Sequence, residues 1–264
     1  MKRIIVKAIT VIGIVSALSG AGALAVSIDT SGANSGFITV EYDKSLSTKV
    51  KTIISKDGVQ YTYDIQSAET ELPLQLGSGT YSVSVHENIS GTTYNTVAST
   101  NVTASGLSDA EVYTNSIQMV NYEAYASVIS EIDAQMANAA TIEEKVQIAK
   151  NYTYVITNYS YDKAKAASVQ SGYVPNLSDF YSTKSGICYD YSSLFAAIMR
   201  SHGVPTKLIM GYSNTASTYH AWNQVMIDGS WVTVDTTYDS QLAAAGRETT
   251  MEKDSSGFQI VKEY

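Results

Sequence analysis

The sequence predicts an α+β protein in which a small all-β sandwich precedes a part built from helices and an antiparallel hairpin. Three observations predict this class. Short alternating runs separated by turn residues fill residues 27–104, helical spacing begins after Gly106, and Asp228-Gly229 joins two β-rich runs. Alternation indicates strands, whereas apolar residues three and four apart indicate helices. We therefore expect a β-sandwich over 26–106 and a second domain over 107–264.

Residues 1–25 have the features of a secretory signal peptide. Lys2 and Arg3 precede an apolar run, and Ala23-Leu24-Ala25 is a small-x-small cleavage pattern. We expect a secreted or cell-surface protein, with a retained anchor as the alternative. A lipid anchor is not expected, because no cysteine stands at the cleavage point. No integral membrane segment is expected in the mature chain.

The charge of the chain excludes one class of partner. Removing residues 1–25 takes away three basic residues and no acids, so the formal charge falls from −8 to −11. An acidic chain lacks the basic surface that binds phosphate backbones. We therefore expect no nucleic acid partner.

The first domain is expected to be an Ig-like sandwich. Its predicted strands are 37–43, 50–57, 59–65, 71–76, 80–87 and 93–100. Turn residues separate them, and short strands at this spacing are typical of antiparallel sandwiches. His86 has no second metal ligand nearby, so we interpret it as a surface or strand-pairing residue.

Two helical segments are predicted before the cysteine. Residues 108–139 have helical spacing and few breakers. In residues 141–162, Thr141 is a suitable N-cap because Glu143 and Glu144 follow in the first turn. The apolar stripe of this second segment predicts core packing.

Cys188 is the only cysteine, so an intramolecular disulfide is excluded. The thiol is buried and inert, a dimer link, or a reagent. Ser185 is the expected cap of a helix that begins at Gly186 or Ile187 and ends before Gly203 and Pro205. Cys188 would then lie in the first turn, where free N–H groups and the helix dipole stabilise a thiolate. His202, at the far end, is interpreted as structural.

The predicted hairpin around Asp228-Gly229 contains His220, a candidate general base for the Cys188 thiol. If Ile227 pairs with Ser230, then Trp222 faces Asp235 and His220 faces Thr237. Side chains alternate along a strand, so His220, Trp222 and Asp235 would share one face. Diagonal neighbours lie roughly 7–8 Å apart, within reach of long side chains. We expect Asp235 to orient His220 and His220 to activate Cys188, with Asp239 as the alternative acid.

These residues carry a family resemblance. The stretches "GICYDYSSLFAAIMRSHGVPTKLIMGY" and "YHAWNQVMIDGSWVTVDTTYD" resemble the transglutaminase-like superfamily over about residues 141–240. The resemblance implies a papain-like core, in which the nucleophile's helix packs on an antiparallel sheet. It also implies that Cys188 is the nucleophile, His220 the base and Asp235 the orienting acid. Bacterial exported members often carry extra modules such as the predicted sandwich.

Three further residues are candidates for the site. The second oxyanion donor varies across the family, and Tyr173 and Tyr181 are candidates for it. Trp222 is a candidate for substrate binding on the His220 face. No calcium loop, phosphate loop or Cys/His metal cluster is apparent in the sequence, so no metal or cofactor is expected.

The family resemblance leaves the reaction open among three hypotheses. The first is an exported cysteine hydrolase that acts, as a monomer, on extracellular or cell-wall peptides or proteins. The second is a protein-glutamine γ-glutamyltransferase that cross-links glutamine to an amine. The third is a non-catalytic binding or adhesion protein. Trp222 and Trp231 could line an acceptor tunnel, but Gln224, Thr233 and Asp235 make the same face polar, which favours hydrolysis.

Overall fold

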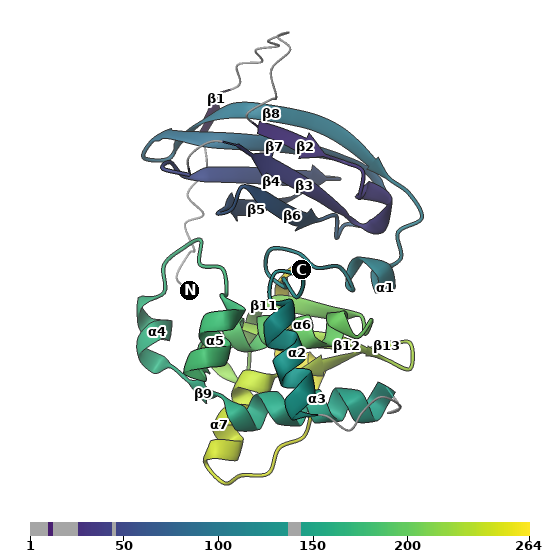
Figure 1. The fold of residues 1–264 in the computed structure, drawn as a ribbon, viewed down its shortest axis with the longest axis vertical. Helices are drawn as coiled ribbons and strands as arrows, with labels where there is room; N and C mark the ends of the chain where they lie inside the picture. Colours follow the sequence, from purple (N-terminus) through teal and green to yellow (C-terminus); the bar gives the residue numbers. More distant parts are fainter. Residues whose placement is uncertain (1–9, 13–25, 44–45, 137–143) are drawn as a thin grey trace. The chain divides into compact units, whose positions relative to one another are not determined.

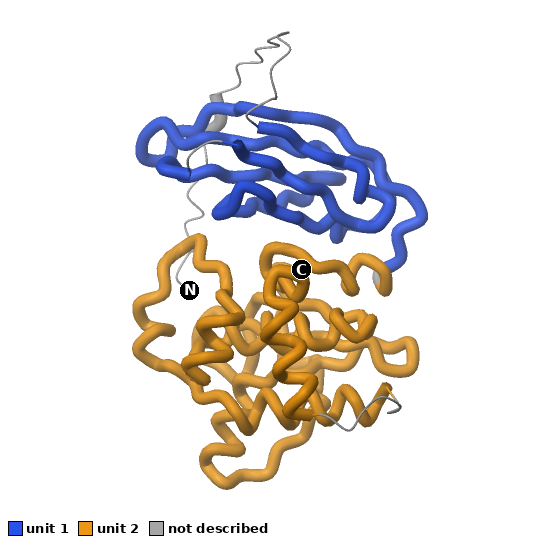
Figure 2. Tube along the Cα trace, viewed as in Figure 1, with its two compact units in different colours: residues 1–108 blue, residues 109–264 orange. Residues whose placement is uncertain are grey.

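The computed structural model describes residues 10–12, 26–43, 46–136 and 144–264 (Figure 1). The chain divides into two compact units, Met1–Ser108 and Asp109–Tyr264 (Figure 2). The predicted signal peptide lies outside the described residues, apart from the three-residue strand β1 (Thr10–Ile12), which pairs in parallel with β8 (Thr93–Ala104). None of the described helices has the length and apolar character needed to cross a bilayer.

The first unit holds two sheets of strands. The larger has the order β1-β8-β7-β4-β5 and the smaller the order β2-β3-β6. Besides β1 and β8, the elements are β2 (Val26–Asp29), η1 (Ala33–Ser35), β3 (Phe37–Tyr42), β4 (Val50–Lys56), β5 (Val59–Ile65), β6 (Glu69–Pro73) and β7 (Gly79–Ser90). All six predicted strands are present, and β1 and β2 are additions. The predicted all-β region is therefore confirmed.

Alternating side chains form the core of this unit. In β7, Tyr81, Val83 and Val85 are fully buried, while the residues between them face outward. Period-two alternation buries one face of a strand and leaves the other toward solvent. His86 is buried and hydrogen-bonds Ser84 and Thr96, so its role is strand pairing.

The second unit combines seven helices with a five-stranded antiparallel sheet of order β14-β13-β12-β11-β15 and a two-stranded pair, β10-β9, within residues 109–136 and 144–264. The helices are α1 (Asp109–Val112), α2 (Ala126–Gln135), α3 (Glu144–Asn158), α4 (Lys163–Ser168), α5 (Leu177–Thr183), α6 (Cys188–Ser201) and α7 (Thr236–Ala244). The strands are β9 (Ser160–Tyr161), β10 (Ser185–Gly186), β11 (Thr206–Ser213), β12 (Ala216–Ile227), β13 (Ser230–Val234), β14 (Glu252–Lys253) and β15 (Phe258–Glu263), and a short 3₁₀ turn, η2, covers Ser255–Gly257. The predicted α+β class is confirmed.

Helix α6 packs on β11 and β12 of the sheet (Figure 1). Leu194, Phe195 and Ile198 are fully buried, as their helical spacing predicts. Asn223 of β12 donates from Nδ2 to the carbonyl of Ser192 at 3.0 Å, which joins helix and sheet by a buried hydrogen bond. The helix is therefore fixed against the strand that carries His220.

The predicted helix over 108–139 is wrong in its middle. The chain forms α1 and α2 and turns between them. Ser116 donates to Asn121 Oδ1, and the same oxygen accepts from the backbone of Ala124, so polar side chains satisfy the backbone in place of helical bonds. Helix α3 confirms the second segment, whereas the predicted cap Thr141 lies outside the described residues.

The predicted hairpin is confirmed, but its ladder is shorter than expected. Ile227 pairs with Ser230, and the pairing runs to Asn223 and Val234. Asp228 and Gly229 have φ values of 50° and 75°, the left-handed conformation that a tight two-residue turn requires. Beyond Val234 the chain starts α7, so Thr237 lies on a helix and does not face His220 across a ladder.

We predict that a fragment of residues 109–264 folds by itself. Its helices and sheet bury their apolar residues within this unit, and a compact unit with its own core folds independently. Urea unfolding followed by far-UV circular dichroism should give one cooperative transition, with the fragment's thiol as reactive as that of the full chain. A fragment without a cooperative transition would contradict the prediction.

Candidate active site

Cys188 is the first residue of α6 and is partly exposed. The preceding residue, Ile187, occupies the cap position in an extended conformation. The first backbone N–H groups of a helix lack intrahelical acceptors, and the helix dipole is positive there. The thiol sulfur therefore lies where negative charge is stabilised.

The predicted cap residue of this helix is wrong. Ser185 belongs to β10 and pairs with Ser160. The carboxylate of Asp190, in the first turn, accepts instead from the N–H of Ile187 at 2.8 Å. Asp190 holds one of the N–H groups at the helix start, so a carboxylate replaces the expected serine hydroxyl.

His220 and Asp235 form a buried pair. The Nε2 atom of His220 lies 2.9 Å from Oδ2 of Asp235, and the Asp235 side chain is fully buried. Asp235 is the N-cap of α7 and accepts from the Tyr238 N–H at 3.0 Å, while Thr215 donates to Oδ2 at 2.8 Å. Three donors fix the carboxylate. The predicted pair is thus placed by a strand end and a helix cap, without the predicted ladder.

The charges around the imidazole favour its protonated form. Burial acts most strongly and lowers the pKa of His220, but hydrogen bonds and charges from Asp235 and Cys188 outweigh it and raise the pKa to about 10. Cys188 is thus close enough to the ring to favour its positive charge. With Nε2 on Asp235, Nδ1 is the nitrogen left for the thiol. This arrangement suits a thiolate–imidazolium pair.

Asp239, the alternative acid, serves other groups. It is fully buried, accepts from the Tyr152 hydroxyl at 2.8 Å, and lies 2.6 Å from Lys253 Nζ. Burial raises the pKa of Asp239, although Lys253 and Tyr152 act in the opposite direction. The structure therefore directs Asp235, and not Asp239, at the histidine.

A pocket of about 290 Å³ contains both Cys188 and His220. Apart from this pair, its described lining consists of neutral residues. They are Tyr161, Ala166, Val169, Ile187, Thr215, Ala216, Ser217, Thr218, Tyr219, Thr237, Tyr238 and Gln241. Hydroxyl and amide groups dominate on the side of β12 and α7, and apolar groups on the side of α4. The pocket can hold an uncharged polar group such as an amide.

The structure does not place the three predicted substrate-binding residues in this lining. Trp222 is fully buried and stacks on His220 with ring centroids 6.2 Å apart, so it packs against the imidazole without lining the pocket. Tyr173 donates its hydroxyl to Asp190, and Tyr181 accepts from Gln135 at 2.7 Å. Trp231 packs edge-on against Tyr113 at 5.6 Å and is also outside the lining.

The tyrosines in the pocket were not predicted from the sequence. Tyr161 reaches the site because β9 pairs in parallel with β10, with Tyr161 opposite Gly186. A two-residue parallel pair leaves no periodic pattern, so no sequence signal indicates it. Tyr219 could have been found from its position beside His220.

The remaining histidine of the second unit is structural. His202 bonds through Nδ1 to the Ile198 carbonyl at 2.8 Å and lies 3.2 Å from Asp133. Within the part of the chain that the structure describes, no group of three or more His, Cys, Asp or Glu residues is arranged to hold a metal ion.

A family model matches part of this chain. Residues 130–236 match the Transglutaminase-like superfamily, which confirms the resemblance predicted from the motifs. Over 103 residues the chain is 29% identical to a UPF0252 protein of Methanocaldococcus jannaschii, covering 35% of this chain. The match spans only 29% of the length of that relative.

Solved structures match this chain at low identity and with TM-scores below 0.5. A candidate cysteine protease of Cytophaga hutchinsonii is 14% identical, with a TM-score of 0.41, over 76% of this chain and 78% of its own. The periplasmic domain of TgpA from Pseudomonas aeruginosa, bound to ethylmercury, is 16% identical, with a TM-score of 0.35, over 77% and 90%. Red sea bream transglutaminase is 12% identical, with a TM-score of 0.31, over 76% and 48%.

We predict that iodoacetamide alkylates native Cys188 at about pH 6.5, where an ordinary free thiol is roughly 1% ionised. His220→Ala removes the cation beside the sulfur and should slow this reaction at least about tenfold. His202→Ala, which changes a histidine outside the pocket, is the matched control and should react at the parent rate. The measurement is the alkylation rate by intact-mass spectrometry. Alkylation only after denaturation would identify Cys188 as an inert structural residue.

We also predict a pH-dependent stability contribution from His220. Its pKa is raised from 6.5 to about 10, so the contribution is fully present below pH 6.5 and is lost as the pH rises through about 10. The free energy of unfolding in urea, compared between the parent and His220→Gln, should therefore favour the parent most near pH 6.5. That difference should shrink by about 1.4 kcal/mol or more toward pH 10. A difference that is independent of pH, or equal to that of His202→Gln, would contradict it.

Proposed function

We propose that the transglutaminase-like segment of this chain is a cysteine-dependent amide hydrolase with Cys188 as nucleophile, His220 as base and acid, and Asp235 as orienting acid. One observation carries the proposal. Cys188 and His220 share a pocket, and His220 Nε2 lies 2.9 Å from the buried carboxylate of Asp235. A thiol, a base and an orienter in this order are the groups needed for nucleophilic catalysis at a carbonyl.

Acylation begins from the ion pair. The Cys188 thiolate attacks the amide carbonyl carbon and forms a C–S bond, and the carbonyl electrons move onto oxygen. When the tetrahedral intermediate collapses, the C–N bond breaks and the His220 imidazolium gives its proton to the departing amine. Asp235 keeps Nε2 engaged, so Nδ1 carries the transferred proton. The product is a thioester on Cys188.

Two donors can stabilise the oxyanion. The backbone N–H of Cys188 is one of the unsatisfied groups at the start of α6. We assign the second donor to the hydroxyl of Tyr161, which lines the same pocket, in place of Tyr173 and Tyr181. Burial, followed by the charges of Cys188 and Asp162, raises the pKa of Tyr161, so its hydroxyl keeps the proton it would donate.

Water resolves the thioester. Neutral His220 takes a proton from water, the hydroxide adds to the thioester carbon, and the C–S bond breaks to return the thiolate. The hydroxyl-bearing wall around Thr215, Ser217 and Thr218 supports this route, because it can hydrogen-bond water. Trp222, Gln224 and Thr233 do not line the pocket, so they do not set the polarity around the thioester.

The substrate and its location are part of the same proposal. Residues 1–25 read as a signal peptide, so we place the enzyme outside the cytosol, acting as a monomer on extracellular or cell-wall peptides or proteins. The neutral lining of the pocket supports an uncharged amide as the group attacked. Neither a metal nor a cofactor takes part in the proposed steps.

We predict hydrolysis rather than amine transfer. A glutamine-containing protein and an isopeptide-linked peptide are each incubated with and without a fluorescent primary amine. Mass spectrometry should show cleaved or deamidated product, with little amine incorporated. Cys188→Ala should abolish the product, and Asp235→Asn should lower the rate about 10²-fold or more because the imidazole loses its orienting charge.

Other outcomes separate the alternatives. Efficient amine incorporation that depends on Cys188 would instead identify a protein-glutamine γ-glutamyltransferase. Turnover that survives Cys188→Ala would contradict the proposed nucleophile. An unreactive thiol without turnover would favour the non-catalytic binding protein.

A further inference from the structure

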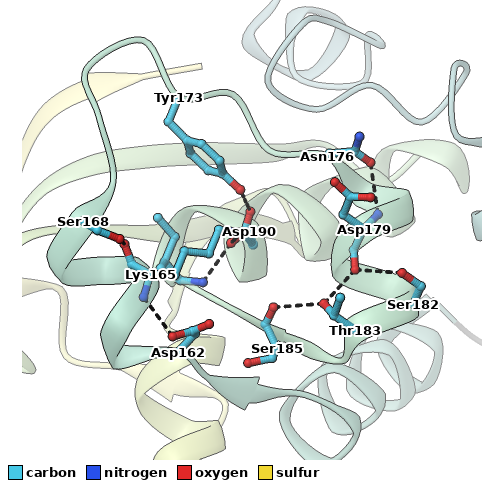
Figure 3. Close-up of polar contacts among 11 residues, drawn as sticks. Asp162, Lys165, Ser168, Tyr173, Asn176, Asp179, Ser182, Thr183, Ser185 and Asp190 are labelled. Atoms are coloured by element: carbon cyan, nitrogen blue, oxygen red, sulfur yellow. Dashed lines mark hydrogen bonds and ion pairs between the residues drawn. The ribbon is translucent and has the colours of Figure 1, made fainter.

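A buried carboxylate lies two residues after the nucleophile and outside its pocket. Asp190 is fully buried, yet it contacts neither Cys188 nor His220 through any hydrogen bond among the described residues. Figure 3 shows two side chains from the segment before α5 pointing at it. Lys165 Nζ lies 2.8 Å from Oδ2, and the Tyr173 hydroxyl donates to Oδ1.

The hydrogen bonds of the Asp190 carboxylate all go to groups that hold the backbone and the neighbouring segment in place. Besides Lys165 and Tyr173, Asp190 accepts from the Ile187 N–H. A buried charge is tolerated when it is paired and hydrogen-bonded, so losing one partner is costly. The backbone is fitted to it, because a Cβ on Gly186 would lie 2.7 Å from Asp190 Oδ2 and 2.6 Å from the Phe180 ring. This close approach requires glycine.

The two partners bracket a wall of the pocket. Ala166 and Val169 line the pocket, and both lie between Lys165 and Tyr173 in the chain. Lys165 also lies 4.9 Å from the centre of the Tyr173 ring, and Tyr173 packs against Tyr189 with ring centroids 6.1 Å apart. Burial, then the hydrogen bond and charge of Asp190, raise the pKa of Tyr173, so the phenol remains a donor. The wall is thus attached at both ends to the nucleophile's helix.

We propose that Lys165, Tyr173 and Asp190 are positioning residues that hold the α4 wall, residues 165–173, at the distance from Cys188 that peptide substrates require. The proposal rests on the proposed function, since it assigns the wall to the binding of the acyl part of a peptide. None of the three touches the reacting atoms. They act through Ala166 and Val169, which would contact the substrate beside the scissile amide.

The test compares two alkylating reagents of different size. Iodoacetamide needs only the thiol, whereas a benzyloxycarbonyl-dipeptidyl chloromethyl ketone also needs the wall. Second-order rate constants for Cys188 are measured by mass spectrometry in the parent, Lys165→Met and Tyr173→Phe. Lys165→Arg is the conservative rescue. Lys163→Met, which alters an exposed lysine on the same helix, is the matched control.

The ratio of the peptidyl rate to the iodoacetamide rate should fall about tenfold or more in Lys165→Met and Tyr173→Phe, since small misplacements at a site are costly. The iodoacetamide rate should stay within about twofold, as expected for groups that do not touch the thiol. The ratio in Lys165→Arg should stay close to that of the parent, and the ratio in Lys163→Met should equal it. Hydrogen exchange of the amides of residues 166–172 should be faster in the two variants.

Several results would overturn the proposal. An unchanged ratio in both variants would show that the wall does not depend on the cluster. An equal fall with both reagents would show that the cluster acts on the thiol. If the parent reacts no faster with the peptidyl reagent than with iodoacetamide, the wall does not take part in substrate binding. If the parent reacts with neither reagent, the proposed function fails, and the exchange of residues 166–172 decides alone: faster exchange supports the anchoring and unchanged exchange refutes it.

Discussion

One buried carboxylate, Asp235, joins the parts of the second unit on which the pocket depends. Its Oδ1 atom caps α7 through the Tyr238 N–H, and its Oδ2 atom accepts from Thr215 and faces His220. A fully buried anion without partners would be strongly destabilising, so the hairpin end, the helix start and the turn before β12 must meet at this point. The orientation of the imidazole follows from that requirement.

At the other helix of the site, α6, a carboxylate also caps the helix and binds a second element. Asp190 caps α6 with one oxygen, which it shares with Lys165, and leaves the second for Tyr173. In both helices a carboxylate satisfies a backbone N–H that the helix leaves free, and its remaining lone pairs organise a neighbouring element. The helix starts are therefore also the junctions at which the walls of the pocket are attached.

Local signals explain which parts of this arrangement were predictable. The Asp228-Gly229 turn fixes a register, and the apolar spacing of Leu194, Phe195 and Ile198 fixes a helix, so both could be predicted from neighbouring residues. The turns between α1 and α2 depend on tertiary contacts, such as the hydrogen bond from Ser193 to the Met119 carbonyl. Tyr161 likewise enters the pocket through a parallel pair that has no periodic pattern. The spacing of residues in the sequence does not indicate long-range pairing of this kind.

The hairpin also divides the contacts of the site into a local pair and a distant one. His220 and Asp235 are 15 residues apart and are joined by a tight turn, whereas Cys188 precedes His220 by 32 residues and meets it only when α6 docks on β12. Closing the shorter loop costs less entropy, and local contacts form before distant ones. The pairing of His220 with Asp235 therefore has the lower entropic cost, whereas the approach of His220 to Cys188 depends on the docking of α6 on β12.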